Sequence, residues 1–215
     1  MPTKPSIAVI GSGQVARTLA KGFQKHGYPV VMGNRTVSKL ADFAKETGLE
    51  VVETAPAAAR AEIVVLAIKG TMAETVVTAL AKELAGKIVV DTTNPIADAP
   101  PVDGVLTYFT SGSESLMERL QKLSPTARFV KAFNSVGSPF MVDPSFPDGM
   151  PTMFIAGNDP DAKLVVASIL TEFGWESQDM GKAASARPIE ALCQLWCARG
   201  FNGNKWGHAF KLLVV

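Results

Sequence analysis

The residues with the plainest chemical use are the small ones in the run Gly11-Ser12-Gly13-Gln14-Val15-Ala16. This run follows the apolar stretch Ile7-Ala8-Val9-Ile10 and opens a segment with the apolar spacing of a helix. Gly11 permits a tight turn, Gly13 lets the backbone approach a pyrophosphate, and Ala16 lets the helix pack closely on a sheet. Free N–H groups at the helix start attract the anion. The spacing predicts a dinucleotide-binding turn formed by the residues from Gly11 to Val15.

The kind of dinucleotide follows from the end of the second apolar run, which reads Gly33-Asn34-Arg35-Thr36 with Lys39 close behind. A site for NAD places a carboxylate here to bind the ribose hydroxyls. This chain has a guanidinium instead, and a guanidinium binds a 2′-phosphate through charge-assisted hydrogen bonds. The pattern favours NADP(H), with Asn34, Arg35, Thr36 and Lys39 as its candidate ligands. The alternative is that Arg35 and Lys39 are only solvated.

Two later apolar runs end in polar residues, in Ala67-Ile68-Lys69 and in Asp91-Thr92-Thr93-Asn94. Ligands of parallel sheets lie beyond the carboxyl ends of the strands. We therefore expect Ala67, Ile68, Lys69 and Asn94 to line the ribose and nicotinamide. Hydrogen bonding within the loops is the alternative role for these residues.

These candidate ligands require a parallel sheet to position them, and the chain alternates apolar runs with helical patterns accordingly. Strands are predicted at 7–10, 29–32, 49–52, 63–68, 87–91 and 128–133. Helices are predicted at 14–25, 38–46, 72–84 and 113–123. Ser38 is the expected N-cap of the second helix, Gly48 ends it, and no helix is expected between 52 and 63. The fold class is α/β, a Rossmann-type doubly wound and mostly parallel sheet.

A smaller α/β unit follows, with strands at 152–156 and 175–178 and helices at 159–173 and 187–199. A turn at 201–204 and a short helix at 208–215 complete it. We expect an NADP-binding domain over 1–135 and a C-terminal extension over 136–215. That extension is too small for a separate substrate domain, so it is expected to contribute to an acceptor site and to a dimer contact.

Composition excludes several classes of function. The chain has 215 residues with 21 Lys and Arg against 20 Asp and Glu, a net charge that argues against a general nucleic-acid or membrane binder. Cys193 and Cys197 share a helix face and, together with His208, match no standard metal pattern, so no metal is expected. No secretory leader or membrane span is recognisable, which favours a cytoplasmic protein without membrane or nucleic-acid partners.

The sequence resembles the family of NADP oxidoreductases that use coenzyme F420. The matching pieces are Gly11-Ser12-Gly13, Gly33-Asn34-Arg35-Thr36, Asp91-Thr92-Thr93-Asn94-Pro95, Val130-Lys131-Ala132-Phe133-Asn134 and the segment from Ala186 to Gly203. The resemblance implies a homodimer that transfers a hydride between NADPH and a bound flavin or deazaflavin. Phe133 stands where the archaeal F420 enzymes carry His, and a similar domain serves membrane ferric reductases. FMN and FAD are therefore alternatives to F420 as acceptor.

Hydride transfer between two bound rings needs orientation more than acid–base chemistry, so no side chain is assigned a certain catalytic role. The candidate acceptor residues are Phe133, Asn134, Ser135 and Arg187. Asn134 would polarise the acceptor by hydrogen bonding, or else cap the loop that follows it. Arg187 would anchor an acceptor phosphate or carboxylate, or else pair with Glu190 on its own helix.

Two other functions remain open at this stage. One is an imine or small-carbonyl reductase related to pyrroline carboxylate reductase, whose N-terminal half is similar. The other is a non-catalytic module that senses NADPH and binds a partner according to redox state.

Overall fold

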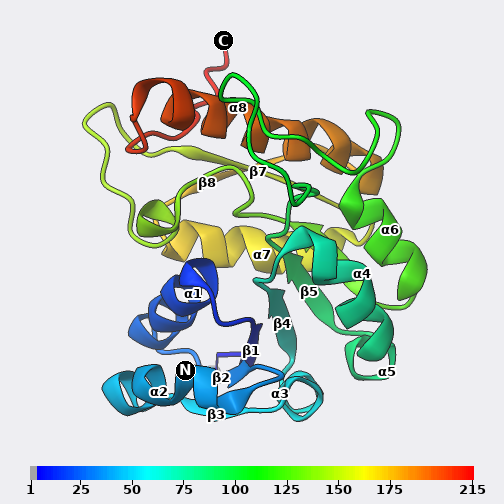
Figure 1. Ribbon diagram of the computed structural model, residues 1–215. Helices are drawn as coiled ribbons and strands as arrows, with labels where there is room; N and C mark the ends of the chain where they lie inside the picture. The colour runs from blue at the N-terminus through cyan, green and yellow to red at the C-terminus, as the bar shows by residue number, and fades with distance from the viewer. Residues whose placement is uncertain (1–3) are drawn as a thin grey trace.

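Short apolar runs form the strands of one eight-stranded sheet in the computed structural model, which describes residues 4–215 (Figure 1). Met1, Pro2 and Thr3, where the expected cofactor-binding half begins, lie outside the described residues. The strands are β1 (Ile7–Ile10), β2 (Val30–Gly33), β3 (Glu50–Val52), β4 (Ile63–Leu66), β5 (Ile88–Asp91), β6 (Arg128–Lys131), β7 (Thr152–Gly157) and β8 (Glu176–Asp179).

The strand order is β3-β2-β1-β4-β5-β6-β7-β8, and β1 to β6 all run parallel. The chain leaves β3 at one edge and crosses back to β4 beside β1, so the order reverses between β1 and β4. A crevice opens at such a switch point beyond the carboxyl ends of the strands. The predicted α/β, doubly wound and mostly parallel fold is confirmed.

Helices cover both faces of the sheet and bury a core on each. One core lies under α1 (Gln14–Lys25), α2 (Ala41–Thr47) and α7 (Pro160–Glu172). The other lies under α3 (Thr54–Arg60), α4 (Gly70–Ala79), α5 (Ala81–Leu84) and α6 (Leu116–Leu123). The central strands β1, β4 and β5 are buried along their whole lengths, which explains their continuous apolar sequences.

The C-terminal residues extend the same sheet. Strand β7 pairs antiparallel with β6, and β8 pairs parallel with β7. Helix α8 (Ala186–Gly203) runs along the top of Figure 1 above these strands, with its first turns beside α6. The proposed division of the chain near residue 135 therefore falls within one continuous sheet.

The predicted connection between β3 and β4 is wrong, because it contains the helix α3. Pro56 and a run of alanines gave no helical pattern in the sequence. Proline is nevertheless tolerated in the first turn of a helix, because the N–H that it lacks would have no intrahelical partner there. The helix expected at 72–84 begins at Gly70 and is divided at Leu80 into α4 and α5.

Three further expectations need correction. Ser38 is no N-cap, since it lies inside a short 3₁₀ turn (Val37–Leu40) that precedes α2, although Gly48 ends α2 with a φ of 72°. Helix α8 continues through the expected turn to Gly203. The tail after His208 forms no helix, because its backbone pairs with Thr152: the Thr152 N–H donates to Phe210 O, and Leu212 N–H donates to Thr152 Oγ1.

Gly33 gives a direct test of the packing between β2 and α3. A Cβ at this position would lie 2.6 Å from Ile10 Cδ1 and 2.9 Å from Ala57 Cβ. Gly33→Ala should therefore lower the free energy of unfolding by about 1–3 kcal/mol, the usual cost of overpacking. Gly112→Ala is the matched control, because a Cβ there meets no atom within 4 Å. Urea unfolding of both variants without ligand measures the difference, and equal midpoints would contradict the packing.

Candidate active site

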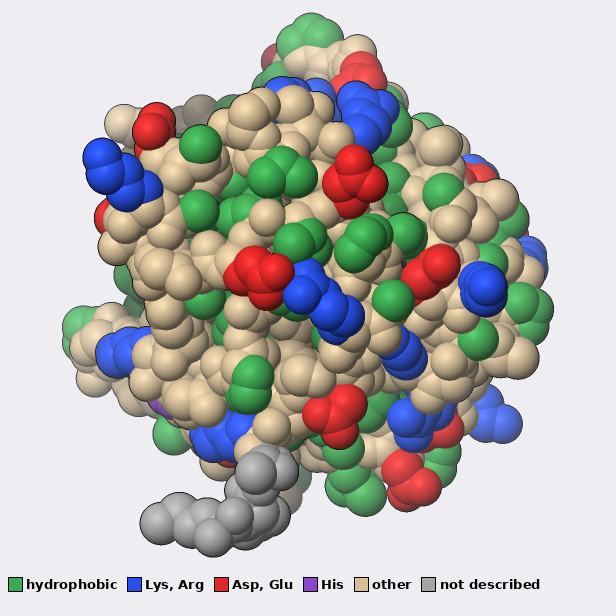
Figure 2. All heavy atoms as spheres, turned by 90° about the horizontal axis from the view of Figure 1, so that it is seen from below, with side chains coloured by type: hydrophobic (Ala, Val, Ile, Leu, Met, Phe, Trp, Pro, Cys, Tyr) green, Lys and Arg blue, Asp and Glu red, His purple; other side chains and the backbone are tan. Residues whose placement is uncertain are grey.

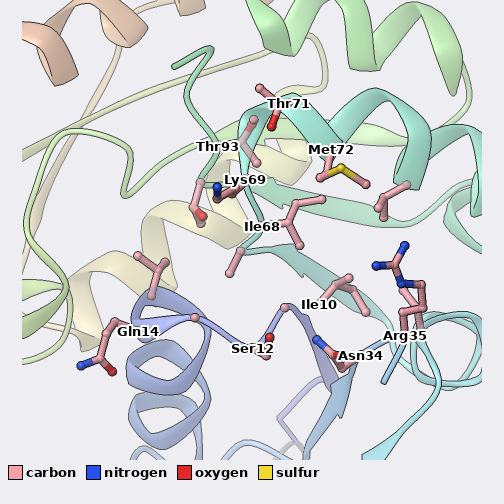
Figure 3. Close-up of a pocket in the computed structure, with 18 of the residues that line it drawn as sticks. Ile10, Ser12, Gln14, Asn34, Arg35, Ile68, Lys69, Thr71, Met72 and Thr93 are labelled. Atoms are coloured by element: carbon pink, nitrogen blue, oxygen red, sulfur yellow. The ribbon is translucent and has the colours of Figure 1, made fainter. Parts of the chain in front are cut away.

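A cavity of about 840 Å³ opens where the strand order reverses, and Figure 3 shows it between the glycine turn and α4. In this view Asn34 and Arg35 lie at the lower right, and Lys69 and Thr93 lie near the centre and above it. Every residue predicted to hold the dinucleotide lines this cavity, and their contact with a cofactor stays a prediction. They are Gly11, Ser12, Gly13, Gln14, Val15, Asn34, Arg35, Thr36, Lys39, Ala67, Ile68, Lys69 and Asn94.

The glycine turn fits a pyrophosphate. Gly11 has a φ of 141°, and a Cβ there would lie 2.1 Å from the carbonyl oxygen of Ala67, so only glycine is accommodated. A Cβ on Gly13 would meet no protein atom within 4 Å, yet Gly13 lines the cavity. The space kept free by Gly13 therefore belongs to the cavity. No side chain caps the start of α1, which leaves its first N–H groups to a bound anion.

The end of the cavity beside β2 is basic. Arg35, Thr36 and Lys39 are exposed, and neither cation forms an ion pair within residues 4–215. The Asn34 side chain accepts a hydrogen bond from the Thr36 N–H at 2.9 Å, which shapes this loop as an Asx turn. The loop thus presents a guanidinium, a hydroxyl and an ammonium with no carboxylate among them.

Arg17 on α1 is a supporting residue that the motif did not indicate. Its Nε donates to Ser12 O at 3.1 Å and its Nη2 donates to Lys39 O at 3.4 Å. One guanidinium therefore joins the glycine turn to the basic loop. The only sequence feature that could have indicated this role of Arg17 is its position one turn into the helix. An arginine at such a position is equally compatible with a side chain that is only solvated.

At the opposite end, α4 begins directly against the loop after β5. A Cβ on Gly70 would lie 1.9 Å from Asn94 O, so glycine permits this close approach. Lys69 precedes the helix and lies 3.6 Å from Asp98 across the cavity, with both side chains largely exposed. In water such a pair contributes little to stability and leaves Lys69 free to turn toward a ligand.

Asn94 and Asn134 form a reciprocal amide pair. Asn94 Nδ2 donates to Asn134 O at 2.8 Å, and Asn134 Nδ2 donates to Asn94 Oδ1 at 3.1 Å. Asn134 Nδ2 also donates to Ile189 O on α8 at 2.8 Å. Asn134 Oδ1 is buried and has no hydrogen-bond donor among the described residues. Asn134 thus links the end of the cavity formed by Asn94 to the C-terminal helix.

The other acceptor candidates lie behind the cavity wall. Phe133 is 1% exposed and packs against Phe173, and its φ of 60° is a strained conformation for an aromatic residue. Its N–H faces Met153 Sδ at 3.1 Å. Phe133 therefore packs into the core behind the cavity wall, and an acceptor contact at this position stays a prediction. Ser135 is also buried, and an acceptor contact for Asn134 or Ser135 stays a prediction.

Arg187 lines a second cavity of about 330 Å³, together with Tyr108, Glu190 and Gln194. The expected pairing of Arg187 with Glu190 is wrong. Arg187 instead makes a bidentate ion pair with Glu118 on α6, at 2.8 and 2.7 Å, and this pair lowers the pKa of Glu118 to about 2. Glu190 points the other way, into the protein.

Glu190 belongs to a buried ion cluster that the sequence did not reveal. Lys131 Nζ lies 2.6 Å from Asp91 Oδ2 and 2.9 Å from Glu190 Oε1, and it donates to Thr93 O at 2.8 Å. Lys131 and Asp91 are wholly buried and Glu190 is 2% exposed. The sequence feature that could have indicated this cluster is a charged residue at the end of an apolar strand. Because strand ends normally lie at the surface, that feature did not predict burial.

The two cysteines are free thiols whose Sγ atoms lie 3.9 Å apart on α8. The His208 side chain makes a different contact: its ring stacks on the ring of Trp196, and the two ring centroids are 4.9 Å apart. The His208 ring therefore packs the tail against Trp196 of α8.

Comparison with known proteins places the chain more narrowly. The model of the family described as NADP oxidoreductase, coenzyme F420-dependent, matches residues 6–95. The crystal structure of a proposed F420-dependent NADP-reductase from Arthrobacter sp. FB24 is 32% identical, covers 98% of this chain and 100% of its own, and has a TM-score of 0.91. The F420-dependent NADP reductase of Methanocaldococcus jannaschii is 27% identical over 202 residues, 88% of this chain and 89% of that protein.

A longer relative is the metalloreductase STEAP3 of Rattus norvegicus, 30% identical over 192 residues, which are 87% of this chain. That match spans only 36% of the metalloreductase, so the chain corresponds to about a third of its length.

The doubly wound sheet, the glycine turn and the basic loop after β2 together define an NADP-binding protein of the Rossmann type. Within that class, the chain belongs to the family of coenzyme F420-dependent NADP oxidoreductases.

The surface shows no strong charge asymmetry on the face at the lower end of Figure 1. Figure 2 shows Lys and Arg side chains there interspersed with Asp and Glu. Across residues 4–215, no helix has the length and apolar character needed to cross a membrane.

Arg35 should distinguish the two cofactors. Arg35→Ala removes charge-assisted hydrogen bonds to a 2′-phosphate, so the Kd for NADPH should rise about tenfold to a hundredfold while that for NADH changes little. Calorimetric titration with each cofactor measures both constants. Arg60→Ala, which removes an arginine outside the cavity, is the control. An equal loss for NADPH and NADH would contradict a 2′-phosphate site.

Proposed function

We propose that the chain transfers a hydride between NADP(H) and a flavin or deazaflavin acceptor of the F420 type. The observation that carries this proposal is one continuous cavity that runs from the exposed Arg35 to Thr93 and Asp98, with the glycine turn between them. The length and chemistry of this cavity suit an extended dinucleotide with a 2′-phosphate. Family membership supports the same cofactor.

Each part of the cavity has a distinct task in this proposal. Arg35, Thr36 and Lys39 bind the 2′-phosphate, and the N–H groups that open α1 bind the pyrophosphate. Ile10 and Ile68 lie between the two ends (Figure 3) and exclude water from the cofactor. Thr93 and the Asn94 loop orient the nicotinamide, which supplies the hydride chemistry once it is bound.

The acceptor is proposed to bind over the nicotinamide end, at the rim formed by Met72, Ile96, Ala97 and Asp98. Met72 is 41% exposed and gives this rim a polarizable apolar surface on which a flat ring can stack. Lys69 stands beside the rim and is exposed, so it is available to an acidic group of the acceptor. Orientation of two rings within one site accounts for the reaction without a dedicated acid or base.

We also propose that the chain forms a homodimer through α8 and the tail. Several large apolar side chains lie exposed there. They are Leu195 at 61%, Phe201 at 46%, Trp206 at 38% and Leu213 at 83%. A twofold partner is the commonest way to cover such a surface.

The acceptor is identified by mixing the protein with NADPH and, separately, F420, FMN, FAD and a cyclic imine. We expect NADPH oxidation, followed at the nicotinamide absorbance band, with F420 or one of the two flavins. Oxidation by the imine alone would favour an imine reductase. Tight NADPH binding without oxidation by any acceptor would contradict the proposed activity and favour a redox sensor.

The dimer is tested by light scattering. The unaltered chain should show twice the monomer mass, and Leu195→Glu should shift it to the monomer because it places a charge in the apolar contact. Leu164→Glu on α7 is the matched control, since Leu164 is exposed to a similar degree, at 69%, but α7 and α8 lie on opposite sides of β7 (Figure 1). A monomeric mass for the unaltered chain would overturn the proposal.

A further inference from the structure

We propose that the buried cluster of Asp91, Lys131 and Glu190 makes the nicotinamide end of the cavity electronegative and thereby favours NADP⁺ over NADPH. The inference rests on the proposed function, in which both cofactor forms bind with the nicotinamide beside Thr93. The oxidised nicotinamide ring carries a positive charge and the reduced ring carries none. A fixed charge beneath the ring therefore acts on one form only.

The hydrogen bonds and ion pairs around the two carboxyl groups are those of carboxylates that face an ammonium. Asp91 Oδ1 accepts from the N–H and the hydroxyl of Thr93, at 2.9 and 2.7 Å, and Oδ2 faces the Lys131 ammonium. Glu190 Oε1 faces Lys131 and accepts from the Met117 N–H, while Oε2 accepts from the Leu116 N–H. Three of the four carboxylate oxygens thus accept a hydrogen bond, and the fourth, Asp91 Oδ2, lies 2.6 Å from the Lys131 ammonium in an ion pair.

Two carboxylates facing one ammonium leave an excess of one negative charge. The Leu116 and Met117 N–H groups begin α6, whose positive end offsets part of this excess. Lys131 stays charged, because the two carboxylates raise its pKa against the effect of its complete burial. Tyr108 bonds to Glu190 O and stays neutral, since burial raises its pKa. The neighbouring Cys193 thiol would add negative charge if it ionised.

One residue, Thr93, connects the cluster to the wall of the cavity. Thr93 lines the cavity, and its N–H and hydroxyl bond to Asp91 while its carbonyl accepts from Lys131. The excess charge therefore lies one residue behind the wall of the nicotinamide end. Asp91 and Lys131 are inaccessible to solvent, so water screens their field only weakly.

A purely structural role for the cluster makes a different prediction from an electrostatic one. If the cluster only positioned Thr93, its disturbance would weaken the binding of NADP⁺ and NADPH by the same factor. A field effect changes the ratio of the two dissociation constants, because only the oxidised ring is charged.

The test is calorimetric titration of NADP⁺ and NADPH on Glu190→Gln, which keeps the side-chain shape and removes one charge. We expect the ratio of the Kd for NADP⁺ to the Kd for NADPH to rise about three- to tenfold. Asp91→Asn is the second variant and should shift the ratio in the same direction. Glu118→Gln is the matched control, because it removes a carboxylate from the same helix junction that has no contact with Thr93. Its ratio should not change.

An unchanged ratio in Glu190→Gln and Asp91→Asn, with both constants weakened equally, would overturn the inference and leave NADP(H) binding intact. Circular dichroism verifies that each variant is folded. If neither variant folds, the unaltered chain decides, since it should bind NADP⁺ at least as tightly as NADPH, and tighter NADPH binding would overturn the inference. Failure of the unaltered chain to bind either form would instead contradict the proposed function.

Discussion

The arrangement of the molecule depends on a buried ammonium held between two carboxylates. Burial of charges is costly, and a cluster of this kind is stable only when each charge finds partners. Lys131 meets this condition by joining the ends of β5 and β6 to α8, and Glu190 extends the junction to the start of α6. Removal of Lys131 would leave two buried carboxylates without a cation between them, so the packing of these four elements depends on the same ammonium.

The wall of the cavity is held in place by this junction and by two glycines that lie directly against backbone carbonyl groups. At one side Gly11 lies against the Ala67 carbonyl, and at the other Gly70 lies against the Asn94 carbonyl. These contacts bring the ends of β1, β4 and β5 together across the crevice. Arg17 adds a polar link between the glycine turn and the basic loop. A ligand therefore meets a wall that is already formed rather than a set of independent loops.

Short sequence patterns predicted those parts of the structure whose conformation is determined by residues close to one another in the chain. The glycine spacing, the basic loop and the buried strands each follow from backbone sterics or apolar periodicity, and the structure places the named residues around one cavity. The helix α3 escaped prediction because Pro56 and small residues give a weak amphipathic pattern. The tail was misjudged because its conformation is set by pairing with Thr152, which is distant in sequence. Likewise, nothing in the sequence near Arg187 or Glu190 indicates that Arg187 pairs with Glu118, or that Glu190 contacts Lys131 and the start of α6.

The antiparallel pairing of β6 with β7 has a consequence for how this protein can be divided. The cofactor cavity is built almost wholly from the first half of the chain, yet the strand that bears Lys131 is completed on its outer side by β7 and capped by α8. A fragment ending near residue 135 would expose the edge of β6 and leave Lys131 with one carboxylate. A segment from β1 to the end of α8 keeps this edge covered and keeps both carboxylates beside Lys131. Gene fusions or engineered chimeras that use this cofactor site must carry all of it.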